Sequence, residues 1–280
     1  MPRDTVTKFF DIAQKKAGLL ETSLRGYLIL SALAGIYLGF GIVLIFTIGA
    51  PLAAAGHPLT RLFMGASFGI ALTLVVFAGA ELFTGNNMFM TVAGLQGHVR
   101  WARIGKLFFW CYVGNLAGSL LIAWLAANTG LLSGDPQAGF IAKVALAKMS
   151  APFSQVFVRG ILANWLVCLA LWTASRASGD GAKIALIFWC LFAFVTSGYE
   201  HSIANMSLLS LAMFIPHPDA VTWAGFVHNL VPSTLGNMVG GGIGVGALYW
   251  LALPENGRLL ARSVEPALAP ARAERVGESR

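Results

Sequence analysis

Charged residues are scarce in this sequence, at 11% of 280 residues, and there are only three cysteines. A soluble domain carries about 25% charged residues, so this chain lacks the polar side chains needed to cover a water-facing surface. Cys111, Cys168 and Cys190 lie inside apolar runs without a CxxC spacing, which argues against a disulfide framework and a thiolate metal site. Neither a GxxxxGK[ST] loop nor an Asn-Pro step occurs. The sequence therefore excludes a P-loop ATPase and a water channel built on paired Asn-Pro-Ala turns.

Apolar residues make up 57% of the chain, glycine contributes 32 residues, and the mean hydropathy is +0.72. Such a chain collapses rather than staying disordered, and abundant glycine is typical of helices that pack closely in lipid. The net charge of +7 comes from short segments between apolar runs, without a basic stripe interleaved with aromatics. The composition predicts an integral membrane protein whose partner is the lipid bilayer, with no nucleic acid.

Six apolar runs divide the chain into a membrane domain and two flanking segments. The first run has 24 uncharged residues, enough to cross about 30 Å of hydrocarbon. Residues 1–26 are predicted to form an amphipathic N-terminal segment, 27–253 a six-helix transmembrane domain, and 254–280 a disordered tail. A polar segment outside the membrane is expected at 143–152. The runs are 27–50, 62–95, 107–127, 161–174, 184–215 and 226–253.

Six spans place both termini on one side of the membrane. On that topology, fifteen of the nineteen Lys and Arg residues lie on the side of the termini. Cytoplasmic loops carry the excess of positive charge, so both termini are predicted to be cytoplasmic.

Two short motifs recur in the same order along the chain. Gly-x-Glu-x4-Asn occurs at 79–86 and at 198–205, inside the two longest runs, and Gly-Asn-x2-Gly occurs at 114–118 and at 236–240. The repeat indicates duplication of a three-span unit, and an odd number of spans requires the copies to be inverted. We therefore expect an all-α inverted repeat whose second and fifth helices are broken, with a transport pathway between the halves.

Polar side chains cluster where the two helices are predicted to break. Backbone that leaves helical geometry at membrane depth must have its N–H and C=O groups satisfied by protein or water. Asn86 and Asn205 can satisfy such groups, and Glu81 and Glu200 are expected to accept hydrogen bonds there in a structural role.

His201 lies at the second break and is the one histidine deep in a span. An intramembrane ionisable group is a functional candidate by default, and imidazole titrates near physiological pH. The alternative is a neutral histidine satisfied in the core by Thr84 or a carbonyl. Other residues have ordinary readings from sequence alone: a solvated lysine for Lys148, an interhelical hydrogen bond for Asn164, and apolar core for Phe68, Leu72 and Phe194.

Five stretches of this chain resemble the formate/nitrite transporter family: GAELFTGN (79–86), GNLAG (114–118), GILANWLVCLA (160–170), SGYEHSIANM (197–206) and NLVPSTLGNMVGG (229–241). The stretches 63–74, 81–91 and 144–152 look most like its bacterial nitrite-channel branch. The resemblance implies an aquaporin-like six-helix protomer in a homopentamer of the bacterial inner membrane, each protomer with its own pore. Ser233 departs from the valine that many members carry at this position.

The resemblance also implies roles for individual residues. His201 would be the central pore histidine, with Thr84 within hydrogen-bond reach. Lys148 and Asn164 would form a polar pair near the periplasmic face. Phe68 and Leu72 would form one hydrophobic constriction and Phe194 the other. It implies no catalytic residue, metal or cofactor.

The expected cargo is nitrite or a similar small anion, together with protons. His201 would either donate a proton, so that the neutral acid passes the apolar rings, or serve as a cationic stepping site for the anion. Formate and hydrosulfide remain alternative substrates. A membrane redox protein is a remote alternative, since it would need paired histidine or cysteine ligands at matching depth.

Overall fold

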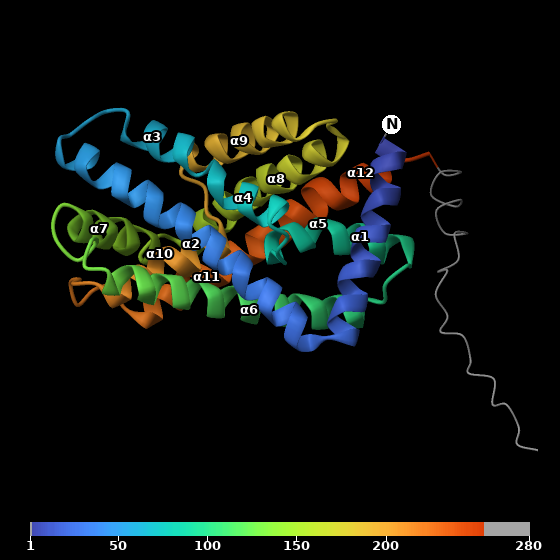
Figure 1. Cartoon of the computed structure of the whole chain (residues 1–280), viewed down its shortest axis with the longest axis horizontal. Helices are drawn as coiled ribbons and strands as arrows, with labels where there is room; N and C mark the ends of the chain where they lie inside the picture. The colour runs from blue at the N-terminus through green and yellow to red at the C-terminus, as the bar shows by residue number, and fades with distance from the viewer. Residues whose placement is uncertain (1, 255–280) are drawn as a thin grey trace, which may run out of the picture.

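A computed structural model describes residues 2–254 of the chain, and all regular structure within that part is helical (Figure 1). The predicted disordered tail, apart from Pro254, lies outside the described residues. The helices are α1 (Pro2–Thr22), α2 (Leu24–Ala54), α3 (Thr60–Ser67), α4 (Gly69–Phe77), α5 (Phe83–Gln96), α6 (Trp101–Asn128), α7 (Gln137–Met149), α8 (Phe153–Arg176), α9 (Asp180–Ser197), α10 (Ser202–Phe214), α11 (Trp223–Met238), the π-helix η1 (Val239–Ala247) and α12 (Leu248–Leu251).

The six predicted spans are confirmed. Five stretches are long and apolar enough to cross a membrane, namely α2, α3 with α4, α6, α8 and α9. The sixth crossing is the continuous run of α11, η1 and α12. The second and fifth crossings continue beyond their breaks as the half-helices α5 and α10, whose residues are almost all buried.

Both breaks begin at a glycine in the left-handed region, Gly79 with φ 78° and Gly198 with φ 75°. This backbone conformation is strained for residues with a Cβ. Two residues after each glycine, the backbone N–H of a glutamate donates a hydrogen bond to a carbonyl of a neighbouring helix. Glu81 N–H donates to Leu30 O at 3.1 Å, and Glu200 N–H donates to Arg159 O at 3.3 Å. The predicted broken helices are therefore confirmed, with equivalent backbone bonding at each break.

Asn115 satisfies the backbone at the first break from within α6. Its Oδ1 accepts a hydrogen bond from Phe83 N–H at 2.9 Å, and its Nδ2 donates to Ser31 O and Glu81 O at 2.7 and 2.8 Å. The side chain is fully buried, where an unpaired amide would be costly.

Asn237 does the same at the second break. Its Oδ1 accepts from Ser202 N–H at 2.8 Å, and its Nδ2 donates to Gly160 O and Glu200 O at 2.8 and 2.9 Å. The inverted repeat is thus visible in individual hydrogen bonds as well as in helix order.

The glycines of the second motif bring helix backbones into contact. A Cβ at Gly118 would overlap the carbonyl oxygen of Ala32, and one at Gly240 would overlap that of Ile161. Because these glycines have no side chain, α6 packs closely on α2, and the start of η1 packs closely on α8.

Each repeat begins with a helix that covers one end of the bundle. Figure 1 shows α1 across one end and α7 toward the other. Most of the segment expected to lie outside the membrane, 143–152, is helical and belongs to α7. Ile141, Ala145 and Met149 recur at helical spacing and are buried, so this short helix packs its apolar face on the bundle.

Candidate functional site

Two separate cavities of similar size lie on the two halves of the repeat. The α7 cavity, of about 500 Å³, is lined by α7, α3 and the break after α9, including Glu200 and His201. The α1 cavity, of about 490 Å³, is lined by α1, α4 and the break after α4, including Glu81 and Leu82. Because α1 and α7 lie toward opposite ends of the bundle (Figure 1), the cavities approach the protein's centre from opposite ends.

His201 is the N-cap residue of α10 and is 3% exposed. Its Nδ1 accepts a hydrogen bond from Ala204 N–H at 3.1 Å, and its Nε2 lies 3.0 Å from Thr84 Oγ1. An Nδ1 atom that accepts a hydrogen bond carries no proton, so this geometry assigns a neutral ring with its proton on Nε2. The ring can therefore offer an Nε2–H donor without becoming a cation.

The two repeats differ at this position. Leu82 follows Glu81 just as His201 follows Glu200, and Leu82 lines the α1 cavity. The inverted repeat therefore supplies one imidazole, and it faces the α7 cavity.

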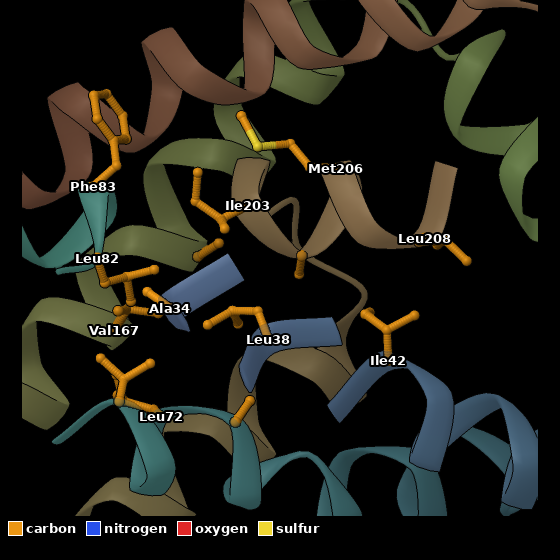
Figure 2. Packing of buried hydrophobic residues seen from close by; sticks show 14 of the residues in the cluster. Ala34, Leu38, Ile42, Leu72, Leu82, Phe83, Val167, Ile203, Met206 and Leu208 are labelled. Carbon is orange, nitrogen blue, oxygen red and sulfur yellow. The ribbon is translucent and has the colours of Figure 1, made fainter. Parts of the chain in front are cut away.

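The three expected constriction residues are grouped differently in the structure. The rings of Phe68 and Phe194 pack edge to face with centroids 5.7 Å apart, and both line the α7 cavity. Phe194 also stacks on the His201 ring at 5.9 Å. Leu72 lines neither cavity and lies in the buried core with Leu82 and Val167, as Figure 2 shows. Phe68 thus belongs with Phe194, because Phe68 lies at the junction of α3 and α4, and both helices pack against α9.

Lys148 and Glu200 form a close ion pair in the wall of the α7 cavity. Nζ of Lys148 lies 2.7 Å from Oε2 of Glu200, which also accepts from Asn205 Nδ2 at 2.6 Å. Asn229 ties this cluster together, since its Oδ1 accepts from Asn205 and its Nδ2 donates to the Lys148 carbonyl. The lysine at this cavity is therefore paired rather than solvated.

The α1 cavity contains the equivalent cluster. Nζ of Lys16 lies 2.7 and 2.8 Å from the two Glu81 oxygens, and Asn86 Nδ2 donates to Glu81 Oε2 at 3.2 Å. Both glutamates thus accept side-chain hydrogen bonds beside their breaks, as expected for a structural role.

Asn164 has different hydrogen-bond partners from Lys148. Its Nδ2 donates to the backbone carbonyls of Thr84 at 3.1 Å and Asn237, and the side chain lines neither cavity. The expected polar pair of Lys148 and Asn164 is therefore replaced by the pair of Lys148 and Glu200. Asn164 instead fixes the backbone that presents the Thr84 hydroxyl to His201.

Sequence reasoning missed several residues of this site. Lys16 and Asn229 complete the two charged clusters, and Leu82 and Val167 join Leu72. Superposing the two motifs by sequence would have paired Leu82 with His201. Asn229 and Val167 lie within stretches that carry the family resemblance but outside the repeated motifs, and Lys16 lies outside both, so the repeat did not point to them.

The family model for formate/nitrite transporters matches residues 3–251. The chain belongs to this family. The nitrite transporter NirC of Salmonella typhimurium is 45% identical over 255 residues, covering 91% of this chain and 93% of that protein. The formate channel FocA of Escherichia coli is 31% identical, covering 79% and 84%.

Solved structures of formate/nitrite transporters share the fold. One described as an FNT family ion channel is 46% identical with a TM-score of 0.85, covering 90% of this chain and 99% of that one. A pentameric formate channel with formate bound is 30% identical with a TM-score of 0.75, covering 82% and 98%. This member of the family is a membrane transport protein with the aquaporin-like six-helix fold, and it is not an enzyme.

Proposed function

We propose that this protein is a homopentameric nitrite channel of the bacterial inner membrane, with both termini in the cytoplasm. The observation that carries the proposal is a single buried imidazole, His201, in the wall of the α7 cavity of a chain 45% identical to nitrite transporters. The excess of Lys and Arg on the side of the termini supports this orientation. The α1 cavity would then open to the cytoplasm and the α7 cavity to the periplasm.

The apolar barrier between the cavities defines the chemical problem. Moving a carboxylate-sized ion into a medium of low dielectric costs about 20 kcal/mol in the idealised limit, and still several kcal/mol after relaxation. The packed rings of Phe68 and Phe194 on one side, and Leu72 with Leu82 and Val167 on the other, provide no hydrogen bond to offset that cost. Nitrite crosses such a barrier most cheaply when its charge is shared or neutralised.

His201 and Thr84 are the polar groups placed to do this. The neutral ring presents Nε2–H toward Thr84 Oγ1, and either group can turn its donor to an oxygen of nitrite. Donating the Nε2 proton outright would leave an imidazolate, so a full proton transfer first needs a proton on Nδ1. That step would break the bond from Ala204 N–H. We therefore favour His201 as a hydrogen-bond donor to nitrite, with any accompanying proton arriving from the cavity together with the anion.

Formate is the second candidate substrate. It is favoured by the likeness to a formate channel whose solved structure holds formate. Formate also matches nitrite in charge and in its two oxygen atoms, so the same donors would serve it.

The test is uptake of nitrite and of formate into proteoliposomes that hold the purified protein and an internal pH dye. Wild-type protein should pass nitrite faster than formate, and His201→Ala should slow nitrite uptake at least tenfold. His57→Ala is the matched control, because His57 is exposed and lies in the loop before α3.

Three outcomes would count against the proposal. Absence of nitrite uptake refutes the substrate, and wild-type uptake by His201→Ala refutes the role of the imidazole. Internal acidification that accompanies each nitrite taken up by the wild type, but is absent per nitrite taken up by His201→Ala, would show that the ring itself delivers the proton.

A further inference from the structure

The cations that line the α7 cavity fall into two classes. Lys148 is paired with the buried Glu200 at 2.7 Å, so the field of its charge is largely cancelled. Arg61, Lys143 and Arg159 also line this cavity. None of these three forms an ion pair with a carboxylate among the described residues.

The three unpaired cations come from three different elements around one opening. Arg61 is exposed near the start of α3, Lys143 is exposed on α7 five residues before Lys148, and Arg159 is half-buried on α8. The Arg61 guanidinium approaches Gly198 at the break, 3.6 Å from where a Cβ would stand. The Arg159 side chain has one hydrogen bond, to Gln155 at 3.0 Å, and its backbone carbonyl accepts from Glu200. The cluster therefore lies beside the route from solvent to Lys148 and His201.

The α1 cavity lacks an equivalent group. Two of its three lysines pair with carboxylates, Lys16 with Glu81 and Lys183 with Asp180 at 2.8 Å. Among the described residues only Lys8, which donates to the Ser175 carbonyl at 3.1 Å, lines this cavity without a carboxylate partner. Uncompensated positive charge is thus concentrated at one mouth of the protein, although the fold repeats.

We propose that Arg61, Lys143 and Arg159 form a capture site for small oxyanions at the mouth of the α7 cavity. The site binds the anion by its positive charge and by guanidinium N–H donors. From there the anion moves along the cavity to Lys148 and His201. This inference rests on the proposed function, since it names where the transported anion first binds. It assigns the attraction of anions to these three residues rather than to the neutralised Lys148.

The expected size of the effect follows from Coulomb's law. Three unit charges about 10 Å from a monovalent anion in water raise its local concentration about eightfold in the absence of salt. At about 0.15 M salt, where the Debye length is about 8 Å, the same charges give less than about a twofold increase. The capture site should therefore change the nitrite concentration at half-maximal flux, in a salt-dependent way, and leave the maximal flux unchanged.

The experiment compares proteoliposomes holding the wild-type pentamer with those holding Arg61→Gln/Lys143→Gln/Arg159→Gln, at about 10 mM and about 150 mM salt. We expect the triple variant to raise the half-maximal nitrite concentration about four- to fivefold at about 10 mM salt, where the Debye length is about 30 Å. At about 150 mM salt the difference should be less than about twofold. Its maximal flux should equal that of the wild type, which also shows that the variant is folded. Sulfate should inhibit wild-type uptake competitively and inhibit the variant much less.

The matched control removes three charges elsewhere. Arg25→Gln/Arg100→Gln/Lys106→Gln neutralises three exposed residues that line neither cavity, and it should behave as wild type. Arg61→Lys/Arg159→Lys keeps the charge and should retain most of the wild-type affinity.

The proposal is overturned if the triple variant matches wild type at low salt, or if the control triple weakens uptake equally. It is also overturned if the loss persists undiminished at high salt. These outcomes all require a wild-type protein that carries nitrite. Failure of the wild type to carry any nitrite refutes the proposed function instead.

Discussion

The ion pair of Lys148 and Glu200 offers a quantitative test of how this fold tolerates charge at its broken helices. The Glu200 side chain is 2% exposed and that of Lys148 is 19% exposed. Replacing Lys148 by Met leaves a buried carboxylate held only by the neutral amides of Asn205 and Asn229, and breaking a buried pair in this way costs about 3–5 kcal/mol. For a domain of about 250 residues, each kcal/mol corresponds to about 2–4 °C in melting temperature. We expect Lys148→Met to lower the melting temperature by about 6–20 °C.

The reverse replacement should cost less. In Glu200→Gln, the freed lysine can extend its ammonium into the water of the α7 cavity, whereas the freed glutamate has no such route. The double variant Lys148→Met/Glu200→Gln removes both charges and should return to within about 5 °C of wild type.

The assay heats the detergent-solubilised assembly, which we propose to be a pentamer, at a series of temperatures and follows the assembly that remains by size-exclusion chromatography. Lys16→Met should cause a similar loss, because the pair of Lys16 and Glu81 is the repeat-related equivalent with a comparable burial. Lys183→Met is the matched control, since its pair with Asp180 is exposed and such pairs contribute about 0–1 kcal/mol. An unchanged melting temperature for Lys148→Met, or a double variant as unstable as the sum of the singles, would refute this reasoning.

Three further predictions concern packing, backbone satisfaction and the site. Gly118→Ala should lower the stability of the fold by at least about 1–3 kcal/mol, because the new methyl overlaps a carbonyl oxygen of α2. Gly105→Ala is the control, since it has open space around it. It should leave the melting temperature unchanged or slightly raised. Asn237→Leu leaves three buried backbone groups without a hydrogen-bond partner, at a cost of about 1–3 kcal/mol each. The yield of folded protein should therefore fall sharply. Asn237→Asp keeps the Oδ1 acceptor and should reduce the yield less. Thr84→Val removes the hydroxyl opposite His201 and should slow nitrite flux about two- to tenfold without changing pentamer melting, whereas Thr84→Ser should transport normally.

Each of these has a clear contrary result. Equal melting of the two glycine variants would mean that the close helix contact is absent in solution. Normal pentamer yield from Asn237→Leu would mean that water replaces the amide. If Thr84→Val lowered the melting temperature as well as the nitrite flux, the flux loss would follow from lost packing and not from the missing hydroxyl.

The local sequence determined most of the architecture. Apolar run length sets the six crossings because the bilayer has a fixed thickness. Glycine followed by glutamate marks each break because only glycine takes the left-handed backbone without strain. The recurrence of both motifs in one order is enough to predict the inverted repeat, and the resemblance to a known family pointed to His201 and Thr84.

Tertiary structure alone decided which side chains meet. Lys148 pairs with Glu200 rather than Asn164, and Phe68 joins Phe194 rather than Leu72, because these contacts join residues more than 50 positions apart on packed helices. Position along the chain does not encode such distances. The same holds for α1 and α7: their sequences show apolar spacing, but only the fold turns Lys16 and Lys148 toward equivalent glutamates. The sequence thus specifies where the helices cross and break, while packing selects the partner of each buried charge, since an unpaired charge in that interior costs too much to persist.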